Sequence, residues 1–208
     1  MGRIKCAINP GAVVFGLGGL ALGLWEWWRR GTGLLEGMLP IAVVLVCAVL
    51  HEMGHVGLAR WAGAEVCGLR LDVFGARLEL SGMLSYGREV LVALGGPMAN
   101  LLSAAAVYPL WQKRGGEGLF LFLTASVLLA AVNLLPVGTL DGGRILYCVT
   151  ALLWGSDVAR SIRGIATGVF LGGIWLLAVY GLLASARFLS LFTFSLCLLL
   201  RSLEDRGK

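Results

Sequence analysis

The sequence predicts an all-α polytopic membrane protein of about six transmembrane helices, with a small β-hairpin between the second and the third. The 208 residues are 58% hydrophobic and 14% charged, and their mean hydropathy is +0.86. A soluble domain is nearer 45–50% apolar and about 25% charged. The apolar residues gather in stretches of about 18–22, the length that a helix needs to cross roughly 30 Å of hydrocarbon. One stretch alternates instead, which is typical of strands.

The expected spans cover residues 8–26, 39–60, 89–110, 118–136, 162–183 and 185–202. The first begins after basic residues, as a signal peptide would. However, an aromatic and basic border at residues 25–30 stands where a signal peptide has a small-residue cleavage site. We therefore interpret the first span as an anchor, and the whole chain, residues 1–208, as a single integral-membrane domain.

The basic residues orient these spans. With the N-terminus in the cytoplasm, 12 of the 17 Lys and Arg residues fall on the cytoplasmic side and five on the other, in agreement with the positive-inside rule. Both termini are then cytoplasmic. The net charge of +5 reflects this topology, so we expect a lipid bilayer and no nucleic acid as the surroundings of the chain.

The second span holds the only two histidines of the chain, His51 and His55, with Glu52 between them. Residues four apart lie on one helix face, separated by about 6 Å of rise, so both rings can point at one ion. Glu52 is rotated by about 100° and reaches the flank of that ion. This H-E-x-x-H spacing suits a zinc site whose glutamate is a general base. The alternative is a pair of satisfied core histidines, but ionisable groups at membrane depth indicate function.

A catalytic zinc ion needs three protein ligands and one open position. No third histidine exists, and the five cysteines form no CxxC pair, so we expect a carboxylate as the third ligand. Most cysteines are interpreted as small buried residues; Cys47 shares the histidine stripe. Asp141 stands in a glycine-rich segment, residues 133–146, that Pro136 interrupts. Broken backbone at membrane depth is tolerated only where protein or a cavity covers it. The alternative role for Asp141 is a helix cap.

At this point the chain resembles a known family. HEMGH in the second span and NLLPVGTLDGG after the fourth are similar to the site-2 proteases, which are intramembrane zinc metalloproteases. GGPMAN, residues 95–100, resembles the Gly-Pro-x-x-Asn segment of that family. The motifs occur in the order of the family and define a catalytic core at about residues 39–146. The flanking spans suit the six-helix branch that contains the stage IV sporulation protease.

The resemblance implies a zinc metalloendopeptidase in which His51, His55 and Asp141 bind Zn²⁺ and Glu52 is the catalytic base. It implies cleavage of a membrane-associated protein substrate, a transcription-factor precursor in a sporulating bacterium. It also implies inhibitory membrane partner proteins and a place in the bacterial cell membrane. Some sporulation relatives carry a C-terminal nucleotide-sensing domain, and we expect none after Lys208.

Three further residues are expected to bind substrate or shape the site. Asn133 and Pro136 match family positions with these roles, and Asn100 is a polar residue inside a span. Thr139 departs from the family, in which a proline is common two residues before the aspartate ligand, so the conformation of that loop stays open. Packing is an equal explanation for GGPMAN, because its small residues permit close helix approach.

Residues 64–82 alternate with period two, which predicts the hairpin, with Phe74 and Gly75 at its turn. Its free edge could receive an extended substrate as an added strand, or the hairpin could only cover the catalytic cavity. The main alternative function is a membrane zinc transporter, although a transporter should have several metal stations along a path. Another type of membrane zinc protease is the nearer alternative, with a carboxylate other than Asp141.

Overall fold

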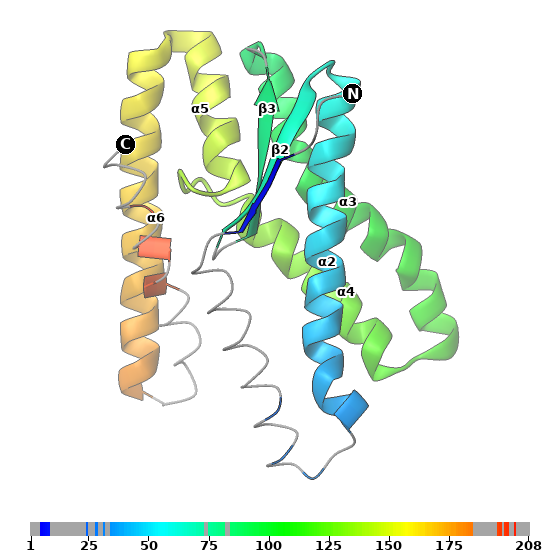
Figure 1. Cartoon of the computed structure of the whole chain (residues 1–208). Helices are drawn as coiled ribbons and strands as arrows, with labels where there is room; N and C mark the ends of the chain where they lie inside the picture. The colour runs from blue at the N-terminus through cyan, green and yellow to red at the C-terminus, as the bar shows by residue number, and fades with distance from the viewer. Residues whose placement is uncertain are drawn as a thin grey trace. The chain divides into compact units, whose positions relative to one another are not determined.

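The computed structural model describes residues 5–8, 24, 28, 31, 34–72, 75–81, 84–184, 195, 196, 198, 199 and 202. These residues are mostly helical (Figure 1). The helices are α2 (Leu34–Trp61), α3 (Tyr86–Arg114), α4 (Glu117–Asn133), α5 (Asp141–Trp154) and α6 (Ser156–Ala184). The strands are β1 (Lys5–Ile8), β2 (Glu65–Asp72) and β3 (Gly75–Ser81).

Three of the described helices are long and apolar enough to cross a membrane. The stretches are Gly37–Trp61 in α2, Tyr86–Arg114 in α3 and Ser156–Gly181 in α6. They agree with the second, third and fifth expected spans. The fourth expected span corresponds to α4, a shorter apolar helix of 17 residues. The first and last expected spans lie almost wholly outside the described residues, so the total of six stays a prediction.

The chain divides into two compact units, which are described separately. The first contains residues 1–84 and 94–131, and the second contains residues 85–93 and 132–208. Helix α3 therefore gives its first residues to the second unit and the remainder to the first.

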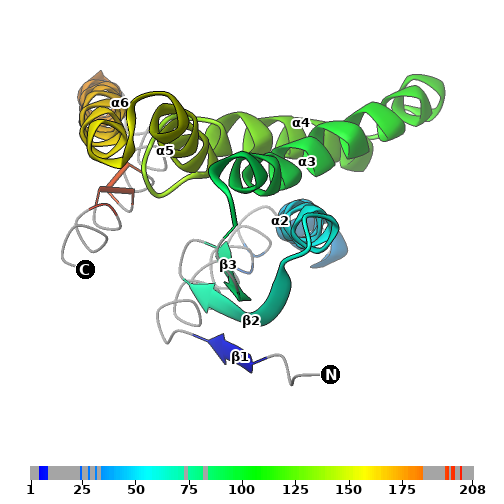
Figure 2. The ribbon, with the colours of Figure 1, turned by 90° about the horizontal axis from the view of Figure 1, so that it is seen from above.

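The first unit contains a three-stranded sheet of order β1-β2-β3. β2 pairs antiparallel with β3 and parallel with β1, and its register shifts between Val66 and Gly68. Asp72 pairs with Gly75, so Gly75 belongs to β3 and not to the predicted turn. Residues 73 and 74, the remainder of that turn, lie outside the described residues. The sheet contacts α2, and among the described residues β3 pairs only with β2 (Figure 2).

Helices α2 and α3 cross at a pair of glycines in the first unit. A Cβ atom added to Gly54 would lie closer than 3.0 Å to the backbone of Gly95, and one added to Gly95 would meet the backbone of Gly54 in the same way. The two backbones are therefore in direct contact. Small residues at a crossing allow this approach in membrane helices.

The second unit contains the loop that follows α4, residues 134–140, and the helices α5 and α6. These helices lie side by side and are joined through Gly155, whose φ of 86° favours glycine (Figure 1). The loop before α5 is attached to α6 by a hydrogen bond, in which the Gly138 backbone N–H donates to Thr167 Oγ1 at 2.9 Å. None of the expected spans includes α5. This helix has 14 residues, fewer than the roughly 20 residues of a membrane span.

Candidate metal centre

The histidine pair lies on the buried face of α2. His51 and His55 are 5% and 8% exposed. Their Nε2 atoms are 3.1 Å apart, and the rings stand edge to face with centroids 4.8 Å apart. The predicted spacing thus brings two nitrogen donors to one point. Because imidazole nitrogens are common zinc ligands, this point is a candidate half of a metal centre.

Gly96 of α3 faces the same point. A Cβ atom added to Gly96 would lie closer than 3.0 Å to the Nε2 atoms of both His51 and His55. Only glycine at this position therefore allows both rings to lie this close to the α3 backbone. Two imidazole nitrogens brought to one point are part of a donor set that zinc accepts, so the residues present fit a bound metal.

Two polar groups of α3 contact the outer nitrogens of the rings. The Gly96 backbone N–H donates to His55 Nδ1 at 3.3 Å, and Asn100 Nδ2 lies 3.2 Å from His51 Nδ1. Asn100 has no solvent exposure, and its Oδ1 is buried without a hydrogen-bond partner. GGPMAN therefore supplies both packing, through Gly95, and direct contacts to the histidines, through Gly96 and Asn100.

Cys47 lies one turn before His51 but is engaged elsewhere. Its side chain is fully buried, and Sγ lies 3.3 Å from Ser126 Oγ on α4. This contact holds α2 against α4 in the first unit. It supports the interpretation of Cys47 as a small buried residue and not as a metal neighbour.

Glu52 follows His51 on α2 and is half-buried. The other predicted site residues belong to the second unit. Asn133 ends α4, Pro136 lies in the following loop and Asp141 is the first residue of α5; all three are half-buried. The N-cap of α5 is Leu140, and no side-chain cap bond is present. Leu140, and not Asp141, therefore occupies the N-cap position, and Asp141 lies in the first turn of α5.

Sequence reasoning missed the place of Gly96. The expectation for GGPMAN is close helix approach by its small residues, with no separate role for Gly96. The available signal was the doubled glycine, because adjacent helix positions point about 100° apart and can serve two different contacts. His51, His55 and Asp141 each offer one ligand atom, and two imidazoles with a carboxylate are a donor set that zinc accepts.

A second polar cluster occupies the second unit. Glu89 of α3 lies 3.7 Å from Arg144 Nε of α5, and its Oε2 accepts a hydrogen bond from Cys148 Sγ at 3.3 Å. Burial, followed by the hydrogen bond to Glu89, raises the pKa of the Cys148 thiol to about 12. Cys148 therefore stays protonated at physiological pH and has little nucleophilic character.

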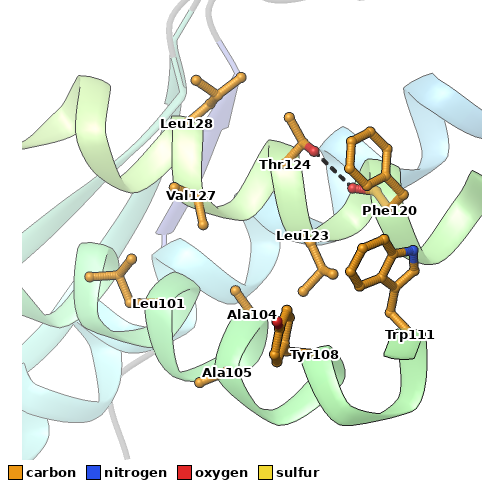
Figure 3. Close-up of a pocket in the computed structure, with 10 residues that line it drawn as sticks. All are labelled: Leu101, Ala104, Ala105, Tyr108, Trp111, Phe120, Leu123, Thr124, Val127 and Leu128. Carbon is orange, nitrogen blue, oxygen red and sulfur yellow. Dashed lines mark hydrogen bonds between the residues drawn. The ribbon is translucent and has the colours of Figure 1, made fainter. Parts of the chain in front are cut away.

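An apolar groove lies in the first unit, between the second half of α3 and α4 (Figure 3). Its volume is about 560 Å³. The lining residues are Leu101, Ala104, Ala105, Tyr108, Trp111, Phe120, Leu123, Thr124, Val127 and Leu128. The hydroxyl of Thr124 is bonded to the Phe120 carbonyl, 2.9 Å away. The lining holds no His, Cys, Asp or Glu, so the groove is not a metal site.

Comparison with known proteins gives a consistent result. No protein-family model matches the chain. The chain is 29% identical over 175 residues to the stage IV sporulation protein FB of Bacillus subtilis, a match that covers 80% of this chain and 60% of that protein. It is 30% identical over 193 residues to Rip3 of Mycobacterium tuberculosis, which bears a zinc metalloprotease name. That match covers 77% of this chain and 47% of Rip3.

The fold has a solved counterpart. The site-2 protease from Methanocaldococcus jannaschii matches with a TM-score of 0.73 and 19% identity, over 96% of this chain and 89% of that one. At this identity the match shows the fold. The chain therefore has the fold of a site-2 protease and sequence similarity to zinc metalloproteases, which confirms the predicted resemblance. The expected enzyme class agrees with the names of Rip3 and of the site-2 protease, and the expected zinc cofactor agrees with the name of Rip3.

Proposed function

We propose that this chain is an intramembrane zinc metalloprotease of the site-2 type, which cleaves a peptide bond in or near a transmembrane segment of a membrane-associated protein. The observation that carries the proposal is the convergence of the His51 and His55 Nε2 atoms beside Gly96, within an apolar pair of helices. The similarity to zinc metalloproteases supports it. Since the chain spans only 60% and 47% of the two relatives, their activities come to it as a proposal.

In this proposal His51, His55 and Asp141 hold the ion. Two arguments support Asp141. A catalytic site needs a third ligand, and the chain has no third histidine and no CxxC pair that could provide it. Asp141 also offers a carboxylate oxygen, which together with two imidazole nitrogens makes a donor set that zinc accepts.

The chemistry needs a base and an oxyanion donor. When bound, zinc would supply Lewis acidity that polarises the scissile carbonyl and makes a water molecule more acidic. The Glu52 carboxylate takes a proton from that water and delivers it to the leaving amine nitrogen. Asn133 donates its side-chain N–H to the oxygen that becomes negative in the transition state. Pro136 keeps the chain after α4 out of a helix, so that substrate can reach these groups.

Substrate presentation is the proposed role of the sheet. A peptide bond in a transmembrane helix is protected by internal hydrogen bonds, so an extended segment must form before cleavage. β3 has one paired side among the described residues and could receive this segment as an additional strand. The alternative is that the hairpin only covers the cavity. Substitution of proline along β3 distinguishes them, because proline removes an edge donor and would slow cleavage without changing zinc content.

The biological setting follows the similarity to the sporulation protein. We include in the proposal a transcription-factor precursor as substrate, an inhibitory membrane partner, and a bacterial cell membrane with both chain termini in the cytoplasm. The excess of basic residues on one side of the expected spans supports this topology. Single cysteines at positions 3, 114 and 206 test it in a cysteine-free background. An external probe that labels 206 and spares 114 would reverse the orientation.

The decisive experiment compares two variants in detergent, with zinc content and cleavage of a membrane-tethered reporter as readouts. Glu52→Gln keeps the ligands, so zinc stays bound and cleavage falls by about 10²–10⁴-fold. Asp141→Ala lowers both zinc content and cleavage. Glu117→Gln and Asp157→Ala are matched controls, because both carboxylates are exposed at helix starts, and both variants should behave as wild type.

A zinc transporter would give a different pattern. Glu52→Gln would change zinc flux into proteoliposomes, and no variant or wild type would cleave the reporter. If the Glu52→Gln variant cleaved the reporter at the wild-type rate, the proposed mechanism would be excluded.

A further inference from the structure

The contacts around the two histidines include one whose direction is certain. The Gly96 backbone N–H can only donate, so His55 Nδ1 is the acceptor of their 3.3 Å contact. A neutral imidazole carries one proton on one of its two nitrogens. The proton of His55 must then lie on Nε2.

This assignment determines the state of the second ring. His55 Nε2–H points at His51 Nε2, 3.1 Å away, so His51 Nε2 accepts that hydrogen bond. With its Nε2 lone pair engaged as an acceptor, His51 must carry its own proton on Nδ1. A proton on His51 Nε2 instead would set two N–H groups against each other across this 3.1 Å contact.

The atom facing His51 Nδ1 is then of the wrong kind. Asn100 Nδ2 lies 3.2 Å from His51 Nδ1, so two donors would face each other. The carbonyl oxygen of the same carboxamide, Oδ1, is buried without a partner. Amide oxygen and nitrogen atoms are assigned from the hydrogen-bond network, and a half-turn of the group exchanges them. The half-turn replaces a repulsive contact by a hydrogen bond from His51 Nδ1–H to Oδ1.

We propose that Asn100 is a positioning residue for the metal centre, whose carboxamide oxygen accepts the Nδ1–H of His51 and so keeps the Nε2 lone pair of that ring directed at the point beside Gly96 where the two Nε2 atoms meet. Metal-binding imidazoles generally donate their second N–H to an oxygen atom, which fixes the tautomer and the ring orientation. This inference rests on the metal site of the proposed function. It makes the two histidines unequal, because His51 is already in the tautomer that presents an Nε2 lone pair, whereas the His55 proton must move from Nε2 to Nδ1 before Nε2 can bind an ion.

The metal-free protein tests this arrangement directly. Because the chain has only two histidines, ¹⁵N-histidine labelling yields two rings, and a His55→Gln variant assigns them. In the full-length wild type in detergent, we expect the Nδ1–H form for His51 and the Nε2–H form for His55. In Asn100→Leu the preference of His51 for the Nδ1–H form should be lost. An Nε2–H form of His51 in the wild type would overturn the proposal.

Zinc affinity provides the second readout, measured by competition with a chelator. Asn100→Leu removes the acceptor and should weaken zinc binding by about 10–100-fold. Asn100→Asp keeps an acceptor oxygen at this position, so its zinc affinity should stay within roughly a few-fold of the wild-type value. Ser103→Ala, one turn further along α3, removes only a hydroxyl bonded to the Ala99 carbonyl and is the matched control.

The pair of variants keeps the proposal falsifiable if one of them folds poorly. Equal zinc loss in Asn100→Asp and Asn100→Leu would mean that Asn100 acts as a donor or only as packing, and the proposal would fail. The proposed proteolytic function fails separately, if wild-type protein binds zinc with the expected tautomers but cleaves no tethered reporter.

Discussion

The first unit and the second unit each contain a polar cluster whose nitrogen, oxygen or sulfur atoms come from two or more helices. In the first unit, the Nε2 atoms of His51 and His55 meet beside Gly96, whose lack of a side chain lets both rings approach α3. In the second unit, the Glu89 carboxylate is occupied by Arg144 and by the Cys148 thiol.

The difference lies in where the lone pairs point. Around Glu89, the negative charge has its own cation and its own hydrogen-bond donor, so the cluster is complete without a ligand. Around the histidines, α3 contacts the outer ring nitrogens, and the two inner nitrogens face each other 3.1 Å apart. Convergence of two potential metal ligands, more than the presence of polar groups, therefore identifies the functional cluster.

The largest expected effect comes from adding a side chain at Gly96. Gly96→Ala keeps every proposed ligand but places a methyl group against both Nε2 atoms. We expect zinc content to fall to background and cleavage to be lost. Gly87→Ala is the control on the same helix, because a Cβ atom there meets nothing within 4 Å. Full zinc content in Gly96→Ala would contradict the position of the metal centre beside this glycine.

A second effect comes from separating the two helices. Gly54→Ala pushes a methyl group into the Gly95 backbone and should destabilise the protein by about 1–3 kcal/mol, the usual range for overpacking. Thermal unfolding in detergent measures this change. Gly57→Ala, three residues along α2, has open space around its Cβ and should remain within about 1 kcal/mol of wild type. Equal stability of the two variants would show that the crossing is looser than described.

A smaller effect is expected in the second cluster. Glu89→Gln removes the partner of Arg144, and since both side chains are partly exposed, the free energy of unfolding should fall by at most about 1 kcal/mol. Zinc content should not change. Asp157→Asn breaks the more exposed pair with Arg160 and should have no measurable effect on stability. Zinc loss in Glu89→Gln would mean that the two clusters are coupled, and the comparison above would not hold.

The smallest effect concerns Cys148 and pH. Its pKa is raised from 9.0 to about 12, so above pH 9 the unfolded chain loses this proton first. The contribution of the thiol to stability is fully present below pH 9 and decreases as pH rises toward 12. Unfolding at pH 8 and pH 10 should therefore show a smaller loss for Cys148→Ala than for wild type. Rapid alkylation of Cys148 in the folded protein at pH 8 would contradict the raised pKa.

Local patterns predicted most of the long elements. Apolar length located α2, α3 and α6, and the i, i+4 rule placed both imidazoles on one face. Strands β2 and β3 fall within the alternating stretch, with the turn shifted because Gly75 already pairs with Asp72. Helix α5 was missed, since its 14 residues are too few for a span and follow a glycine-rich loop.

The parts of the site that could not be predicted depend on contacts between helices. The doubled glycine indicates two different contacts, but which groups Gly96 and Asn100 meet depends on the crossing of α2 and α3. The parallel pairing of β1 with β2 is similarly non-local. Asp141 was selected as a ligand by elimination and by resemblance, and its role stays a prediction.

The crossing of Gly54 and Gly95 also limits how the sequence can change over evolutionary time. In most packed contacts, a larger side chain on one side can be accommodated by a smaller one on the other. Here each α-carbon already faces a glycine, and no smaller residue exists. A larger residue at either position therefore cannot be compensated by a smaller residue at its partner, so substitutions in this pair are disfavoured in either order. We expect alignments of homologous chains to show both glycines retained together, even where the surrounding apolar residues are freely exchanged.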